Sequence, residues 1–538
     1  MNILIRNAKI IDGSGAPAYK ANVGISDGKI VLKDLPGEAE QVIEAEGRTL
    51  TPGFIDAHSH GDMAFGTDYG DLCKLNQGVT TQIAAQCGNS NAPVSPEYVE
   101  EKRLELGVYM RPVPDEIYGW TSWSKYADYV DTLPKGLNTA LFVGFNTMRT
   151  AVMGNADRPA DREEIKKMQD LLREAMEHGA LGMSSGLAYV PGTFADTGEV
   201  AEVAKAMAPF GGIYATHLRN ESFDHVKAVK EAVEIGRRAG VAVSISHFKV
   251  MGRKNWGRAQ LAVAEIEKAR AEGLSVTVDQ YPYDSCMTIL HASMPPWYFT
   301  KGVDRAVEYL KDPGMRAGIR EEMNDPECDY ENFYLNAGGF PGVIICSAPK
   351  TPEAEGMTVT DFAAKNGKDP FDAFADLLIE NRCQVSAIYN TIGEKDMEEI
   401  FRLPYCTVGS DGLVSSRSGM CHPRGWDSMV RAITYFGYER QMMTLEELIR
   451  KITSLPAEIY GLQGRGCIMD GAAADLVLLD EKRLRSNASY QTPTALAGGI
   501  DMVFVNGEIA YRDGALTGRM PGKLIRSGSR RGVGGRIS

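Results

Sequence analysis

The sequence predicts an α/β fold, a (β/α)8 TIM-like barrel, with a small β-sandwich domain formed by the N- and C-terminal segments. Three observations support this prediction. The middle of the chain alternates short apolar runs with amphipathic stretches, both ends consist of strand-like runs and turns, and 538 residues suffice for one large and one small domain.

The two ends of the chain, residues 1–50 and 464–525, are predicted to form the small β domain. Near the N-terminus Asp27-Gly28 separates two apolar runs, and near the C-terminus Asn506-Gly507 does the same. Both dipeptides favour the tight turn of a β-hairpin. Because the ends of a chain often lie close together, we expect the two segments to share one domain.

Residues 51–463 are predicted to form the barrel. Helical spacing of apolar residues marks the stretches 162–178, 225–239 and 260–271. Strands that alternate with helices pair in parallel, and eight of them close into a barrel. A doubly wound open sheet is the alternative, but no Gly-x-Gly-x-x-Gly follows an early strand. The candidate strands are 51–57, 79–85, 138–144, 180–184, 212–216, 241–246, 274–280 and 405–409.

The stretch at about 285–345 interrupts this alternation. It contains Met294-Pro295-Pro296-Trp297, an amphipathic segment and a charged run. We interpret it as an insertion between the last two barrel strands, serving either as a packing element or as a cover over substrate. Residues 526–538 are rich in Arg, Gly and Ser and are predicted to form a disordered tail.

Composition and charge limit the class of protein. Lys+Arg 58 against Asp+Glu 71 gives a net charge of −13, which argues against a nucleic-acid or anionic-membrane partner. The N-terminus lacks the apolar core of a signal peptide, and no run is long enough to span a bilayer. The nine cysteines form no Cys-x-x-Cys pair, as is typical of a reduced, cytoplasmic protein. The composition therefore favours a cytoplasmic protein that acts on a small molecule, and it leaves the oligomeric state open.

Metal-binding residue types follow several of the predicted strands. Barrel enzymes place their chemistry at the carboxyl ends of the strands, and four of the eight histidines fall there. His58 and His60 should point to the same side of a strand, because side chains alternate along it. Two satisfied histidines at a strand end are the alternative if this pair is taken alone. The full set is His58, His60, Cys87, His217, His247 and Asp411.

These residues give the chain a specific resemblance, which covers nearly its whole length. It resembles the amidohydrolase superfamily, and within it the D-aminoacylase (N-acyl-D-amino-acid deacylase) family. The motifs are Pro52-Gly53-Phe54-Ile55-Asp56-Ala57-His58-Ser59-His60, Cys87, His217, His247-Phe248-Lys249, Tyr281-Pro282-Tyr283 and Ser410-Asp411-Gly412. The resemblance implies a tight zinc site made by Cys87, His217 and His247. It also implies a second, more weakly occupied position formed by His58, His60 and Asp411.

The chemistry of these residue types agrees with a catalytic zinc. Three protein ligands with an open fourth position are typical of catalytic rather than structural zinc. The fourth predicted strand, Ala180-Leu181-Gly182-Met183-Ser184-Ser185, has no lysine to bridge two metals, which favours the cysteine-type site. Zinc lowers the pKa of bound water and polarises a carbonyl. Asp411 is the candidate general base, although Ser-Asp-Gly is also a common turn.

Substrate contacts are expected from two cations and three tyrosines. An N-acyl amino acid carries a free carboxylate, which Lys249 or Arg424 would hold. Tyr189, Tyr281 and Tyr283 could hydrogen-bond the substrate or the developing oxyanion, or else pack in the core. Three other histidines, His178, His225 and His291, and the cysteines other than Cys87 are expected to be structural.

The leading functional prediction is zinc-dependent hydrolysis of N-acyl-D-amino acids to a D-amino acid and a carboxylate. The first alternative is a cyclic-amide hydrolase of the dihydropyrimidinase or hydantoinase type, against which Cys87 and the missing lysine weigh. A barrel that binds a ligand without catalysis is the second alternative.

Overall fold

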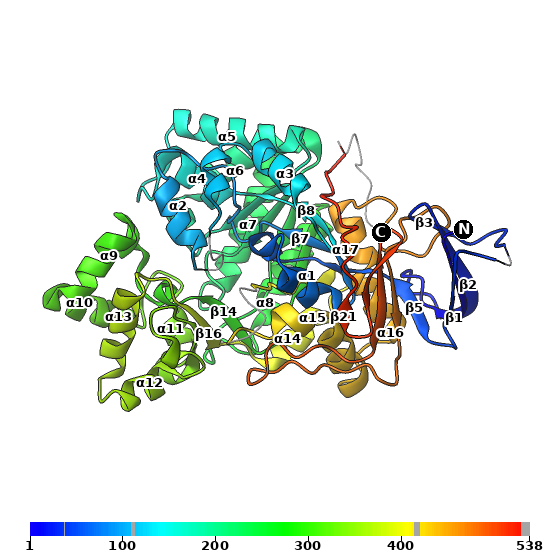
Figure 1. Ribbon diagram of the computed structural model, residues 1–538. Helices are drawn as coiled ribbons and strands as arrows, with labels where there is room; N and C mark the ends of the chain where they lie inside the picture. The colour runs from blue at the N-terminus through cyan, green and yellow to red at the C-terminus, as the bar shows by residue number, and fades with distance from the viewer. Residues whose placement is uncertain (37, 109–112, 414–419, 529–538) are drawn as a thin grey trace.

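The computed structural model describes residues 1–36, 38–108, 113–413 and 420–528 (Figure 1). A central parallel barrel lies between a terminal β-sheet on one side and a helical insertion on the other. None of the helices in these ranges is long and apolar enough to cross a membrane.

The predicted barrel is confirmed. Its strands pair in parallel in two sheets, β6-β7-β8 and β17-β13-β12-β11-β10-β9. The backbone N–H of Ala57 donates to the carbonyl of Val408 at 3.1 Å, and Ser59 bridges to Gly412, so that the first and last strands meet. The strands are β6 (Phe54–Asp56), β7 (Val79–Ala84), β8 (Asn138–Leu141), β9 (Val143–Gly144), β10 (Gly182–Gly186), β11 (Ile213–His217), β12 (Ala242–Ile245), β13 (Val276–Gln280) and β17 (Cys406–Val408). Since β8 and β9 are one strand interrupted at Phe142, the barrel has the expected eight strands.

Amphipathic helices surround the barrel strands. In α5 the buried residues Met168, Leu172, Ala175 and Met176 recur at helical spacing, and Asp161 caps its N-terminus with Glu164. This pattern is why the sequence predicted the helix nearly to the residue. The barrel helices are α1 (Asp68–Leu75), α2 (Val99–Leu106), α3 (Trp123–Thr132), α4 (Phe145–Met153), α5 (Arg162–Glu177), α6 (Thr197–Ala204), α7 (His225–Ala239), α8 (Ala259–Ala271), α14 (Glu394–Phe401), α15 (Arg424–Arg431), α16 (Leu445–Ile452) and α17 (Ser454–Tyr460).

Both ends of the chain contribute to one mixed sheet, seen in blue and red in Figure 1. The two contributions join where β5 pairs with β18 antiparallel, and apolar side chains from both fill one core. The candidate strand 51–57 is divided at Gly53, because β5 lies in this sheet while β6 lies in the barrel. The strands are β1 (Ile3–Ile10), β2 (Tyr19–Ser26), β3 (Lys29–Val31), β4 (Gln41–Glu44), β5 (Thr49–Pro52), β18 (Leu476–Leu479), β19 (Ile500–Val505), β20 (Glu508–Arg512) and β21 (Ala515–Leu516).

A small antiparallel sheet with its own helices separates β13 from β17. In this sheet β16 lies between β14 and β15 and pairs with both. The insertion therefore continues well past residue 345, where the predicted insertion stops. Its elements are β14 (Ser285–Ile289), α9 (Gly302–Lys311), α10 (Pro313–Met323), α11 (Phe333–Asn336), β15 (Val343–Ser347), α12 (Val359–Lys365), α13 (Pro370–Glu380) and β16 (Ser386–Asn390).

The start of the predicted disordered tail has fixed contacts. The Arg526 guanidinium lies 2.6 Å from the Asp131 carboxylate, and the Ser527 N–H donates to the carbonyl of Gly179. These contacts hold Arg526 and Ser527 against the outside of the barrel, while the disorder of the tail stays a prediction. Residues 529–538 lie outside the described residues.

Candidate metal centre

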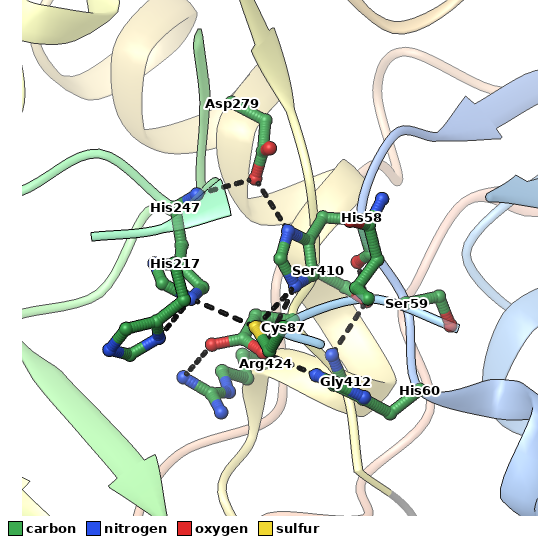
Figure 2. Close-up of polar contacts among 12 residues, drawn as sticks. His58, Ser59, His60, Cys87, His217, His247, Asp279, Ser410, Gly412 and Arg424 are labelled. Carbon is green, nitrogen blue, oxygen red and sulfur yellow. Dashed lines mark hydrogen bonds and ion pairs between the residues drawn. The ribbon is translucent and has the colours of Figure 1, made fainter. Parts of the chain in front are cut away.

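The candidate ligands meet at the carboxyl ends of the barrel strands. His217 is the last residue of β11, and the others lie two to four residues beyond their strands. Figure 2 shows the imidazoles of His58 and His247 in contact with the sulfur of Cys87, and that of His217 in contact with the His247 ring. The structure therefore brings the predicted residues together at these strand ends.

The three residues of the predicted tight site are in direct contact. The Cys87 Sγ lies 3.2 Å from the His247 Nε2, and that nitrogen lies 2.9 Å from the His217 Nδ1. All three side chains are largely shielded from solvent, since His217 and His247 are 3% and 2% exposed. The Cys87 sulfur and the His217 Nδ1 therefore both contact the His247 Nε2.

The other three predicted ligands form an adjoining group. The Asp411 Oδ1 lies 3.5 Å from the His58 Nε2 and 3.3 Å from the His60 Nε2. His58 also lies 3.4 Å from the Cys87 Sγ, which joins the two groups. Cys87 thus lies between the two predicted metal positions.

Three of these residues have a strained backbone. Cys87, His247 and Asp411 have φ angles of 54°, 35° and 48°, in the left-handed region that non-glycine residues rarely adopt. Such strain costs about 1–3 kcal/mol per residue and gathers at functional sites. The fold therefore holds these side chains in place at an energetic cost.

Local charges favour the metal-binding form of the cysteine and the ionised form of the aspartate. Burial raises the pKa of the Cys87 thiol, but His247 and His58 outweigh it and hold that pKa well below its usual range. Burial also raises the pKa of Asp411, but the charges of Arg424 and His247 lower this pKa by more, so that it lies well below its usual range. A thiolate is the form of cysteine that binds metals.

The residues fit a zinc ion. Zinc bonds of 2.0–2.3 Å in a tetrahedron place ligand atoms roughly 3.3–3.6 Å apart. The ligand atoms of His58, Cys87, His247 and Asp411 all lie within 4.8 Å of one another. The buried Nδ1 of His60 has no hydrogen-bond partner among the described residues. The donor types therefore suit zinc, but this compact group combines Cys87 and His247 of the predicted tight site with His58 and Asp411 of the second position, whereas His217 groups with Glu221 and His247.

A layer of acidic residues orients the ligands, and the sequence analysis missed it. The Asp279 Oδ1 accepts from the His247 N–H at 2.9 Å and lies 3.3 Å from the His58 Nδ1. The Glu221 carboxylate lies 3.1 Å from the His247 Nδ1 and 3.6 Å from the His217 Nε2. Carboxylates on the far side of metal-binding histidines fix their orientation. A charged residue inside the apolar strand 274–280 was the available signal for Asp279.

A buried ion pair links the first and last barrel strands beneath the site. The Lys74 ammonium donates to the Asp56 carboxylate at 2.6 Å and to the Ser410 hydroxyl at 2.9 Å. Ser410 in turn donates its backbone N–H to Asp56 at 2.7 Å. This network fixes the backbone immediately before Asp411.

The two predicted substrate-binding cations are both buried and paired. The Lys249 ammonium lies 2.8 Å from the Glu221 carboxylate, 2.7 Å from the His247 Nδ1 and 3.0 Å from the His247 carbonyl. The Arg424 Nη1 lies 2.8 Å from the Asp411 Oδ2, and its Nη2 donates to the Met287 carbonyl at 3.1 Å. The Nε of Arg424 has no hydrogen-bond partner among the described residues.

The predicted tyrosines occupy different positions. The Tyr189 ring lies 4.7 Å from the His217 ring, on the wall of a cavity. The Tyr281 ring lies 4.8 Å from the Arg424 guanidinium, whereas Tyr283 packs against His422 and Arg431. The buried hydroxyls of Tyr281 and Tyr283 have no hydrogen-bond partner among the described residues.

A cavity opens onto this centre. His60, Cys87, His217, His247 and Asp411 line one part of it, and residues of the insertion line the rest. His178 and His225 lie away from it, on helices, whereas His291, expected to be structural, contributes to its wall. A small molecule can therefore reach the candidate metal ligands.

Comparison with known proteins identifies related chains. An amidohydrolase family model matches residues 41–259 and 363–511. A D-aminoacylase from Alcaligenes xylosoxydans xylosoxydans is 32% identical, with 97% of each chain covered. An N-acyl-D-aspartate deacylase from the same organism is 33% identical, with 98% of this chain and 95% of the relative covered.

Solved structures agree with these relatives. An N-acyl-D-glutamate deacylase from Bordetella bronchiseptica, complexed with zinc and a phosphonate inhibitor, has a TM-score of 0.82 at 31% identity. The match covers 98% of this chain and 100% of that one. A D-hydantoinase has a TM-score of 0.55 at 15% identity, with 98% of this chain and 99% of that one covered, and shares the fold alone.

Proposed function

Because the chain belongs to the amidohydrolase family, we propose that it is a zinc-dependent deacylase of N-acyl-D-amino acids. It hydrolyses the linear amide and releases a D-amino acid and a carboxylate. The observation that carries the proposal is the contact of Cys87 with His247 and of His247 with His217 at the mouth of the barrel.

In this proposal Cys87, His217 and His247 hold the tight zinc ion, and His58, His60 and Asp411 form a weaker second position. Zinc, when bound, polarises the amide carbonyl and lowers the pKa of water. Glu221 and Asp279 keep the histidine rings in the ligating orientation. The chain itself then has to bind the substrate and move a proton.

Asp411 is the proposed proton carrier. Its Oδ1 faces the two histidines of the second position, and its Oδ2 faces Arg424. An ionised carboxylate there can take a proton from the attacking water and deliver it to the departing nitrogen. Tyr281, whose hydroxyl is buried without a partner among the described residues, would donate to the developing oxyanion. Tyr189 and Tyr283 remain proposed substrate contacts.

The free carboxylate of the substrate is proposed to bind Arg424, with Lys249 nearby. The ammonium of Lys249 has three N–H donors, two of which the Glu221 carboxylate and the His247 carbonyl accept at 2.8 and 3.0 Å. Arg424 has five N–H donors and leaves its Nε unused among the described residues. This count of donors favours Arg424.

Further parts of the assignment follow from the sequence. We infer domains at residues 1–50 with 464–525 and at 51–463, a cytoplasmic location and a small-molecule substrate without nucleic-acid or membrane partners. All nine cysteines are free thiols, which supports a reducing compartment.

The test compares linear with cyclic amides. Purified enzyme with added zinc should hydrolyse N-acetyl-D-amino acids and leave hydantoins and dihydropyrimidines intact. Ring opening without deacylation would replace the proposal with the cyclic-amide alternative, and failure of the protein to bind zinc, cobalt or nickel would favour a non-catalytic barrel.

A further inference from the structure

The cavity above the metal centre reaches from the candidate metal ligands to the helical insertion. The part distant from the ligands is built by β14 and the helical insertion. Its chemistry therefore decides which substrate groups fit there.

This distal wall is apolar. Met287 and Ile289 on β14, Met294 and Phe299 in the following turns, Val303 on α9 and Phe333 on α11 all line it. Burial of apolar surface contributes roughly 25 cal/mol per Å², so an apolar substrate group gains by contact with this wall.

The charges on the described part of the wall oppose an acidic group. Its acidic residues include Glu101 and Glu105, and its basic residues are Lys249 and Arg382. Lys249 is paired with Glu221 at 2.8 Å, and Arg382 with Asp304 at 2.6 Å. Burial lowers the pKa of His291 to about 4, so this ring is neutral at pH 7. A substrate carboxylate would find no unpaired cation among these lining residues, and burying an unpaired charge is costly.

The apolar wall is continuous with the reaction centre. The Tyr189 ring lies 4.7 Å from the His217 ring and 6.3 Å from that of Phe333. On β14 the carbonyl of Met287 accepts from Arg424, the proposed partner of the substrate carboxylate. Because the carboxylate and the side chain of an amino acid share one carbon atom, the side chain of a bound substrate lies next to β14.

Resting on the proposed function, we propose that this enzyme selects N-acyl-D-amino acids with uncharged, apolar side chains, and that Ile289 is one residue that sets this preference. D-Aspartate and D-glutamate derivatives, named as substrates of two of the relatives, are poor substrates here.

A substrate panel on the wild-type enzyme tests this proposal. With added zinc, kcat/KM for N-acetyl-D-leucine and N-acetyl-D-methionine should exceed that for the D-aspartate and D-glutamate derivatives by at least about 100-fold, since specificity arises from unpaired groups in the pocket. Comparable or higher values for the acidic substrates would overturn the selectivity and leave the deacylase function standing. No turnover of any N-acetyl-D-amino acid would overturn both.

A pair of variants tests the role of Ile289. Ile289 is half-buried, so Ile289→Ala should lower the ratio of kcat/KM between N-acetyl-D-leucine and N-acetyl-D-alanine by about 5- to 10-fold. Ile344, half-buried on β15 of the same small sheet and absent from the cavity wall, is the matched control, and Ile344→Ala should leave the ratio unchanged. An unchanged ratio in Ile289→Ala, or an equal fall in both variants, would exclude Ile289 as a specificity residue.

Discussion

Replacement of Asp411 by asparagine isolates the proposed proton transfer. Asp411 has a left-handed backbone with φ 48°, a conformation that asparagine tolerates nearly as well as aspartate. The amide oxygen of asparagine can still accept a hydrogen bond from Arg424, whose Nη1 lies 2.8 Å from the carboxylate. The variant therefore keeps the shape of the site and loses the group that takes a proton at neutral pH.

The expected cost is large in activity and smaller in stability. General acid–base catalysis contributes about 10²–10⁴ in rate, so kcat should fall by that factor, equivalent to about 2.7–5.5 kcal/mol in the barrier. Removing one partner of a buried ion pair costs about 3–5 kcal/mol in folding. Because asparagine retains a hydrogen bond to Arg424, the loss of unfolding free energy should stay below that range.

The assay is kcat for an N-acetyl-D-amino acid in zinc-loaded enzyme, with zinc content and thermal unfolding measured on the same sample. Asp513 also has a left-handed φ, of 49°, and is exposed far from the site, so Asp513→Asn is the control for the backbone. A near-normal kcat in folded, zinc-replete Asp411→Asn enzyme would refute the assignment of Asp411 as the base.

Three further predictions concern the metal, the carboxylate and pH. Cys87→Ala should lower zinc content and activity together, because the sulfur lies between both predicted metal positions; full zinc occupancy with normal turnover would remove it from the site. Arg424→Ala should abolish the preference for a free over an amidated substrate carboxylate more completely than Lys249→Ala, as kinetics on both substrates would measure. If the wild-type enzyme ignores amidation, neither residue binds the carboxylate. Burial, then the neighbouring Glu221, raises the pKa of Glu331 to about 7 in the fold. The contribution of Glu331 to the free energy of unfolding is therefore fully present below its unfolded pKa of about 4.3. As pH rises through about 7 this contribution is lost, which lowers the free energy of unfolding by about 3 kcal/mol. Glu331→Gln should remove this part of the pH dependence in denaturant titrations at pH 5 and 8, and an unchanged dependence would contradict it.

The barrel was predictable because its signals are local. The helix 225–239 was predicted with both ends correct, since its apolar spacing is regular and Gly240 ends it in a left-handed conformation. The division of the first strand at Gly53 could not be predicted, because β5 and β6 form one continuous apolar run. A Cβ at Gly53 would lie 2.1 Å from the Thr80 hydroxyl, so close packing requires glycine there, and only the tertiary structure shows this contact.

The candidate ligands were predictable as residue types at strand ends, but their supporting contacts were not. Asp279 and Glu221 reach His58 and His247 across strands that are distant in the sequence. The partners of Lys249 could not be read from its position two residues after His247, because the Glu221 carboxylate comes from the preceding strand's loop. Pairing of charges between loops is a property of the assembled barrel mouth rather than of any one segment.

The central claim is that zinc held at the mouth of this barrel enables hydrolysis of N-acyl-D-amino acids. The most direct measurement is the hydrolysis of N-acetyl-D-leucine and its L-enantiomer by purified protein, before and after chelation and during stepwise return of zinc. The D-substrate should be hydrolysed, activity should vanish with the chelated metal, and it should return as zinc approaches one ion per chain. Full activity in the metal-free protein, or no hydrolysis of any N-acyl-D-amino acid at any zinc content, would contradict the claim.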